Sequence, residues 1–121
     1  MFKRVYYTER IKIFESLLDA KAQLKENYVQ KFTVKNKTIC LLLNNNVLYA
    51  FENKCPHNGA SLVGAKCAEN KSIVCPLHRY AFSLIDGKAV SNPCGPLQLY
   101  KVVVDENGVF IEFEKSRFKF F

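Results

Sequence analysis

The chain carries the stretch C-P-H at residues 55–57 and, after residues 58–74, the stretch C-P-L-H at residues 75–78. Each stretch offers one thiolate and one imidazole at short spacing, and the chain has no other histidine. Cysteine sulfur and histidine nitrogen are ligands for both zinc and iron. We therefore expect one metal site with two cysteine and two histidine ligands. Its predicted ligands are Cys55, His57, Cys75 and His78.

The spacing of these ligands bears on which metal is bound. Zinc sites of this composition usually pair like with like, as C-x2-4-C in one half and H-x3-5-H in the other. Here each half is mixed, which fits two parallel loops that each send a cysteine to one iron and a histidine to the other. A 2Fe-2S cluster with two histidines on one iron has this ligand set. The mixed spacing favours the cluster, and zinc stays open as the alternative.

The pattern C-P-H-x-G-A, followed by C-P-L-H with an aromatic residue two positions further on, resembles the Rieske iron-sulfur domain. It is most similar to the soluble Rieske-type ferredoxins, and the resemblance runs from about residue 10 to about residue 113. It implies an all-β fold with antiparallel sheets and a cluster-binding part of two ligand loops. It also implies one Rieske 2Fe-2S cluster per chain.

Formal charges predict the redox behaviour of such a cluster. Two ferric ions, two sulfides and two thiolates sum to zero when the imidazoles are neutral, whereas four thiolates would leave a dianion. A neutral centre accepts an electron more easily, in agreement with potentials of roughly −150 to +300 mV for Rieske centres against about −400 mV for plant-type ferredoxins.

Within that range we expect a potential near the low end. In the high-potential cytochrome bc type, a disulfide joins the loops and hydroxyl groups donate to the cluster. Here the disulfide positions are Ala60 and Leu77, and the serine and tyrosine positions are Tyr80 and Phe82. Fewer donors stabilise the reduced cluster less. Arg79 stands where the family usually has glycine, which puts in question the turn after the second histidine.

Composition and length fit one domain over residues 1–121. The chain is 49% hydrophobic and 13% aromatic, which suffices for a packed core. It has no apolar run long enough to span a membrane and no secretory h-region near its start. These features predict a cytoplasmic protein. In that compartment Cys40 is expected to be a core residue, whereas Cys67 and Cys94 fall in loop-like sequence.

Alternating and β-branched runs, separated by Asn, Lys and Gly turns, predict an antiparallel meander on both sides of the ligand stretches. Ser16 is a candidate N-cap for one short helix ending near residue 24. The cluster-binding part is expected at about residues 53–96, and a short basic-aromatic tail at residues 115–121. The predicted strands cover residues 10–14, 28–34, 38–43, 47–51, 72–74, 80–84, 97–104 and 109–113.

The net charge of +7 comes from scattered basic residues, so we expect a solvated surface and no nucleic-acid or membrane partner. A basic carrier would instead be steered toward acidic docking surfaces on redox partners.

A Rieske centre with four protein ligands has no open coordination position and passes one electron at a time. The resemblance therefore implies an electron carrier, not an enzyme, between a flavin-dependent reductase and a terminal oxygenase. Two alternatives stay open: a small Rieske-fold subunit of a nitrite reductase-like enzyme, and a redox sensor.

Overall fold

The computed structural model describes residues 1–77, 79–90 and 94–120. His78, the fourth predicted ligand, lies outside the described residues, as does part of the predicted proline-containing loop at residues 91–96. The described elements follow one another in the order β1 (Phe2–Phe14), α1 (Leu17–Gln23), β2 (Gln30–Val34), β3 (Lys37–Asn44), β4 (Val47–Glu52), β5 (Ser72–Val74), β6 (Ala81–Ser83), β7 (Leu99–Asp105) and β8 (Gly108–Phe120).

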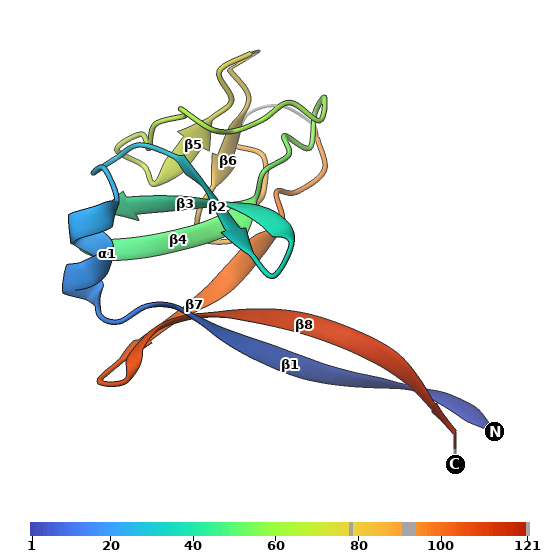
Figure 1. The fold of residues 1–121 in the computed structure, drawn as a ribbon. Coiled ribbons are helices and arrows are strands. Elements are labelled where there is room, and N and C mark those ends of the chain that lie inside the picture. Colours follow the sequence, from blue (N-terminus) through green and yellow to red (C-terminus); the bar gives the residue numbers. More distant parts are fainter. Residues whose placement is uncertain (78, 91–93, 121) are drawn as a thin grey trace.

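In the described part of the chain these strands form two antiparallel sheets. The larger sheet has the order β1-β8-β7-β4-β3-β2, and the smaller one pairs β5 with β6. Figure 1 shows the small sheet and its loops at one end of the molecule, and the β1–β8 pair leading away at the other end. The all-β fold with one short helix is thus confirmed.

Turns that contain asparagine connect the strands of the meander formed by β2, β3 and β4. Lys35 and Asn36 between β2 and β3 both have positive φ, and so do Asn45 and Asn46 between β3 and β4. Two consecutive left-handed residues define the type I′ turn, whose twist matches that of the flanking strands. The same chain segments that the sequence marked as turns therefore close the two hairpins.

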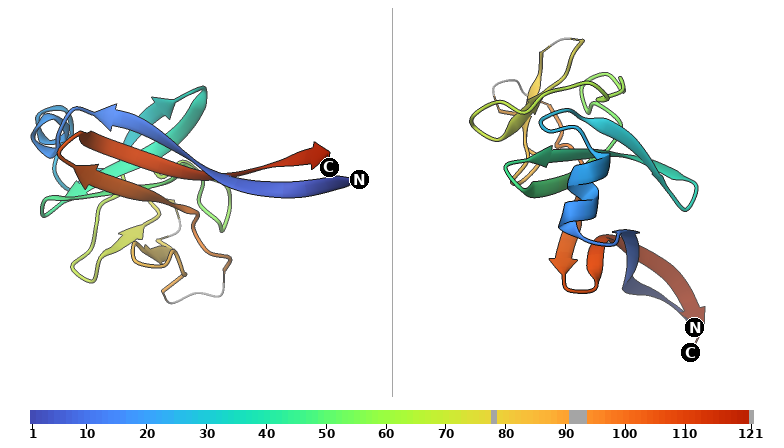
Figure 2. Two further views of the ribbon diagram at one scale, coloured as in Figure 1. Left: turned by 90° about the horizontal axis from the view of Figure 1, so that it is seen from below. Right: turned by 60° about the vertical axis from the view of Figure 1, so that its left-hand side comes forward.

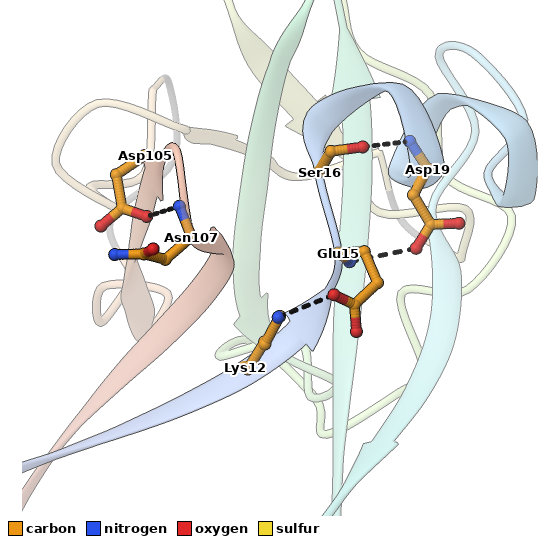
Figure 3. Close-up of polar contacts among 6 residues, drawn as sticks. All are labelled: Lys12, Glu15, Ser16, Asp19, Asp105 and Asn107. Carbon is orange, nitrogen blue, oxygen red and sulfur yellow. Dashed lines mark hydrogen bonds and ion pairs between the residues drawn. The ribbon is translucent and has the colours of Figure 1, made fainter.

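The helix α1 begins as its sequence predicts. The Ser16 side chain accepts a hydrogen bond of 3.0 Å from the Asp19 backbone N–H, and Asp19 Oδ2 accepts one of 3.1 Å from the Glu15 N–H (Figure 3). Such reciprocal caps satisfy N–H groups that have no partner inside the helix. Figure 3 also shows Asp105 Oδ1 accepting from the Asn107 N–H, which fixes the turn between β7 and β8.

The large sheet separates two hydrophobic clusters. One is formed where α1 and the inner ends of β1 and β8 pack against β2, β3 and β4, and it includes Phe14, Ile39 and Ile111. The other lies between the sheet and the ligand loops, and includes Phe51 and Phe82 together with the two predicted ligand cysteines. Successive side chains of β3 point to opposite faces of the sheet, so they contribute alternately to the two clusters. The middle of β3 is therefore buried on both faces.

The ends of the chain differ from the prediction. The first strand begins at Phe2 and not near residue 10, and the basic-aromatic tail is the outer part of β8. The two strands pair from Phe2 with Phe120 to Phe14 with Val109, and their outer parts extend away from the body (Figure 2). Neither segment alternates regularly between apolar and polar residues, and nothing in the sequence says that segments a hundred residues apart pair. In the described residues no helix is long and apolar enough to cross a membrane.

Candidate metal centre

The first ligand loop leaves the end of β4 and returns on itself within six residues. The Cys55 N–H donates to the Ala60 carbonyl at 2.8 Å, and the Gly59 N–H donates to the Cys55 carbonyl at 2.7 Å. Gly59 has a φ of +77°. Because its ends are joined by these bonds, the loop presents Cys55 and His57 from a closed turn.

The second ligand loop, which connects β5 to β6, repeats this pattern. The Cys75 N–H donates to the Tyr80 carbonyl at 2.8 Å, and the Arg79 N–H donates to the Cys75 carbonyl at 3.0 Å. Arg79 occupies the position of Gly59 and also has a positive φ, 59°. The turn that its side chain put in question is therefore formed, with an exposed arginine in the left-handed region.

The two loops bring Cys55 and Cys75 together beneath the surface. Their exposed fractions are 0% and 1%, and both are free thiols. Burial raises the pKa of the Cys55 thiol, and a hydrogen bond with the Cys75 side chain raises it further. The backbone N–H groups of His57 and Asn58 act in the opposite direction on that pKa, because they donate to the Cys55 sulfur. Backbone N–H groups aimed at sulfur are the surroundings that an iron-sulfur centre requires.

His57 lies outside this pair, at the surface. Its ring stacks on the ring of Tyr80 from the second loop, with centroids 3.9 Å apart and an interplanar angle of 12°. The stack links the two loops and fixes the plane of the imidazole. Tyr80 stands at one of the two positions that carry a hydroxyl donor in high-potential relatives, and Phe82, at the other, is fully buried in the core.

Three of the four predicted ligands thus lie in the described residues, where no group of three or more His, Cys, Asp and Glu side chains is gathered closely enough to hold a metal ion. The donor set nevertheless fits a Rieske cluster. Two buried thiols that form no disulfide lie side by side, with backbone N–H groups aimed at one of them, and an imidazole lies nearer the solvent.

The sequence reasoning missed Asn53, which anchors the first loop. Its Oδ1 accepts hydrogen bonds from the Leu62 N–H at 2.9 Å, the Ser61 hydroxyl at 2.9 Å and the Cys40 thiol at 3.2 Å. Burial raises the pKa of Cys40 to about 12, so this thiol stays protonated and can donate. A polar residue directly after a buried strand and two positions before a ligand was the available signal. The buried position of Cys40 confirms that it is a core residue.

The family follows from comparison with known proteins. The family model described as "Rieske [2Fe-2S] domain" matches residues 15–101. The chain belongs to this family. The match includes both ligand loops and leaves out the whole of β1 and the whole of β8.

Named relatives agree with this assignment. The chain is 34% identical, over 70 residues, to a 3-phenylpropionate/cinnamic acid dioxygenase ferredoxin subunit from Photorhabdus laumondii, a stretch that covers 57% of this chain and 67% of that protein. The chain thus spans about two thirds of the length of the curated relatives that it matches.

Solved structures share the fold. The ferredoxin of carbazole 1,9a-dioxygenase from Nocardioides aromaticivorans is 28% identical with a TM-score of 0.69, over 84% of this chain and 95% of that one. A complex of reduced oxygenase and oxidised ferredoxin of carbazole 1,9a-dioxygenase matches at 25% identity and a TM-score of 0.65, over 84% and 91%.

The predicted family, the 2Fe-2S cofactor and the electron-carrier function are confirmed by these matches. For the alternative, the comparison shows the fold alone: a nitrite reductase small subunit from Mycobacterium tuberculosis is 17% identical with a TM-score of 0.65, over 95% of this chain and 96% of that one. The assignment of the four ligands stays a prediction.

Proposed function

We propose that this chain is the ferredoxin component of a multi-component oxygenase, holding its cluster through Cys55, His57, Cys75 and His78. It takes single electrons from a flavin-dependent reductase and delivers them to a terminal oxygenase. The observation that supports this most is the division of the site by depth, with both cysteines buried side by side and His57 at the surface. An electron carrier needs such an arrangement, because the donor must approach the acceptor through an exposed edge.

The residues of the site would divide the work as follows. The two cysteines would hold the inner iron as thiolates, and His57 with His78 would hold the outer one. When bound, the cluster supplies one-electron chemistry with no open coordination position. The N–H groups of His57 and Asn58 would hold the sulfur of Cys55 in place, and Tyr80 would keep the His57 ring in its plane.

The catalytic step of an oxygenase belongs to another protein in this proposal. A terminal oxygenase needs a second iron held by two histidines and a carboxylate. Within these 121 residues, both histidines are already assigned to the cluster. The relatives are ferredoxin subunits of dioxygenases, and one solved match is a ferredoxin bound to its oxygenase. The same proposal includes a flavin-dependent reductase as the electron donor and the cytoplasm as the compartment in which the protein acts.

Electron delivery can be measured directly. Chemically reduced protein is mixed in a stopped-flow instrument with an oxidised terminal oxygenase of the aromatic-ring type, and the return of the oxidised visible spectrum is followed. We expect second-order reoxidation that slows as ionic strength rises, because the chain carries a net charge of +7. A nitrite reductase large subunit serves as the comparison acceptor. Reoxidation by that subunit alone would contradict the proposal in favour of the reductase alternative.

A further inference from the structure

The outer part of the β1–β8 pair, residues 2–7 and 115–120, is a two-stranded ribbon with two chemically different faces. Directly paired residues of an antiparallel ladder lie on the same face, and the next pair lies on the other. We name these the aromatic face and the cationic face. The aromatic face consists of Phe2, Arg4, Tyr6, Ser116, Phe118 and Phe120, and the cationic face of Lys3, Val5, Tyr7, Lys115, Arg117 and Lys119.

The cationic face continues toward the body and is held there. At its inner end Glu9 pairs with Lys115 at 3.0 Å, and with Lys35 from the β2–β3 turn at the same distance. Further out, the Arg117 guanidinium lies 5.5 Å from the centre of the Tyr7 ring. The Glu9–Lys35 ion pair joins the inner end of the ribbon to the rest of the sheet, and the other two contacts lie within the ribbon on its cationic face.

The aromatic face is exposed over its whole length. Its four aromatic side chains are exposed by 70% (Phe2), 76% (Tyr6), 63% (Phe118) and 67% (Phe120). Contacts on this face are made within the ribbon: the rings of Phe2 and Phe120 meet edge to face at 5.3 Å, and Arg4 lies 4.5 Å above the Phe118 ring. An arginine stacked in this way is flat and can remain inside an apolar contact.

Such a ribbon needs a partner. An isolated two-stranded sheet is marginal in water, and packing against another layer is what stabilises it. Phe and Tyr present about 150–250 Å² each, so four that are roughly two-thirds exposed offer on the order of 500 Å². This is the size of the largest apolar patch on a typical monomer, about 300–600 Å², and such a patch often marks an interaction site. Two copies facing each other would bury on the order of 1,000 Å², which is the lower limit for a specific interface.

We propose that the aromatic face is a homodimer interface, in which the outer ribbons of two copies stack face to face. A two-fold axis brings the same patch of both chains together, so one apolar face is complementary to itself. Stacked sheets interdigitate their inward side chains, and the two cationic faces would then point away from each other into solvent. Pairing through the ribbon edges would instead align like charges, and lysines on edge strands are a common guard against it.

The position of the ribbon suits this assembly. It leaves the body at the end opposite the β5–β6 sheet and the ligand loops (Figure 1), so both clusters of a dimer stay accessible to redox partners. The ribbon also lies outside residues 15–101, the part that matches the family. Self-association through the ribbon is therefore separate from the cluster and from the residues that the family model matches.

Salt separates this proposal from its competitors. A dimer held by aromatic contacts between two cationic chains should become tighter as salt screens their repulsion. An acidic protein or an anionic membrane would bind the cationic face, and its affinity would fall with salt. The sign of the salt effect therefore reports which face is used.

The test is sedimentation equilibrium of the cluster-loaded protein, with a reductant to prevent intermolecular disulfides, at about 0.1 and 0.5 M salt. We expect a concentration-dependent dimer with a lower Kd at high salt. The double variant Phe118→Ser/Phe120→Ser should raise Kd more than about tenfold. The matched variant Arg117→Ser/Lys119→Ser changes neighbouring positions on the other face and should leave Kd unchanged or lower. Iron content and visible spectra show that each variant is folded.

Three outcomes would overturn the proposal. These are a monomer at every concentration, a dimer that the arginine and lysine substitutions abolish, and a dimer that dissociates as salt rises. Flotation with phosphatidylserine-containing vesicles is run in parallel. A monomer that binds these vesicles through the cationic face would assign the ribbon to a membrane surface instead.

Discussion

The two ligand loops share one backbone design but differ in what stabilises it. Both close with a bond from the cysteine N–H to the carbonyl five residues on and a bond back to the cysteine carbonyl. The first loop has glycine at its left-handed position and is anchored by the Asn53 side chain. The second has Arg79 at that position and is carried by the β5–β6 hairpin. The comparison shows that backbone hydrogen bonds define the loop and that glycine only lowers its conformational cost.

If both loops supply ligands to one cluster, removing the cysteine of either loop should reduce cluster binding to the same extent. We expect this loss to be the largest effect of any substitution in the two loops. Cys55→Ser and Cys75→Ser should each reduce the iron and sulfide bound per chain at least about tenfold, because a 2Fe-2S cluster needs both thiolates. Cys67→Ser is the control, since this thiol lies outside the loops and donates to the Ala68 carbonyl. Retention of a normal cluster by either ligand variant would break the equivalence.

The histidines provide a sharper form of the same comparison. His57→Cys adds a negative charge to the cluster, so the reduction potential should fall by on the order of 100 mV or more where a cluster still assembles. His78→Cys should give a fall of similar size, because both imidazoles are assigned to one iron. Spectroelectrochemical titration measures both. An unchanged potential in either variant would remove that residue from the ligand set.

Asn53 tests whether the first loop depends on its side-chain anchor. Asn53→Ala leaves the Leu62 N–H and the Ser61 and Cys40 donors without their acceptor, and we expect a loss of about 1–3 kcal/mol in stability. The measurement is the urea concentration at which the visible absorption of the cluster disappears. Asn58→Ala, which removes one exposed bond to the Ala60 N–H, should lower that concentration less. Equal effects would mean that Asn53 is no special anchor.

Substitutions at the two residues with left-handed backbone, Gly59 and Arg79, should change the free energy of unfolding least, and in opposite directions. Gly59→Ala should cost about 1 kcal/mol, because an L-residue is disfavoured at positive φ, while its Cβ would meet only Lys54 Cε at 3.8 Å. Arg79→Gly should gain about 0.5–1 kcal/mol by relieving the same cost. Urea unfolding of both variants gives the signs. Destabilisation by Arg79→Gly would show that the arginine side chain makes a stabilising contribution of its own.

Local patterns predicted much of this molecule. The Asn and Lys turns, the Ser16 cap and the buried Cys40 were identified from the sequence because each depends on near neighbours or on residue type. The family followed from two spaced motifs. The pairing of residues 2–9 with residues 113–120 was not predicted, because these segments do not alternate regularly and a local pattern cannot identify a partner a hundred residues away. The Asn53 anchor was missed for the same reason, since its hydrogen-bond partners are set by the fold.

The central claim is that the two loops together hold a sulfide-bridged pair of irons through two sulfurs and two nitrogens. Its most direct test is electron paramagnetic resonance of the dithionite-reduced protein, combined with iron, sulfide and zinc analysis of the same sample. The account predicts two irons and two sulfides per chain, and a reduced-state signal with the low average g value of a centre that has nitrogen ligands on one iron. A zinc-containing protein without iron, or the signal of an all-cysteine cluster, would contradict it.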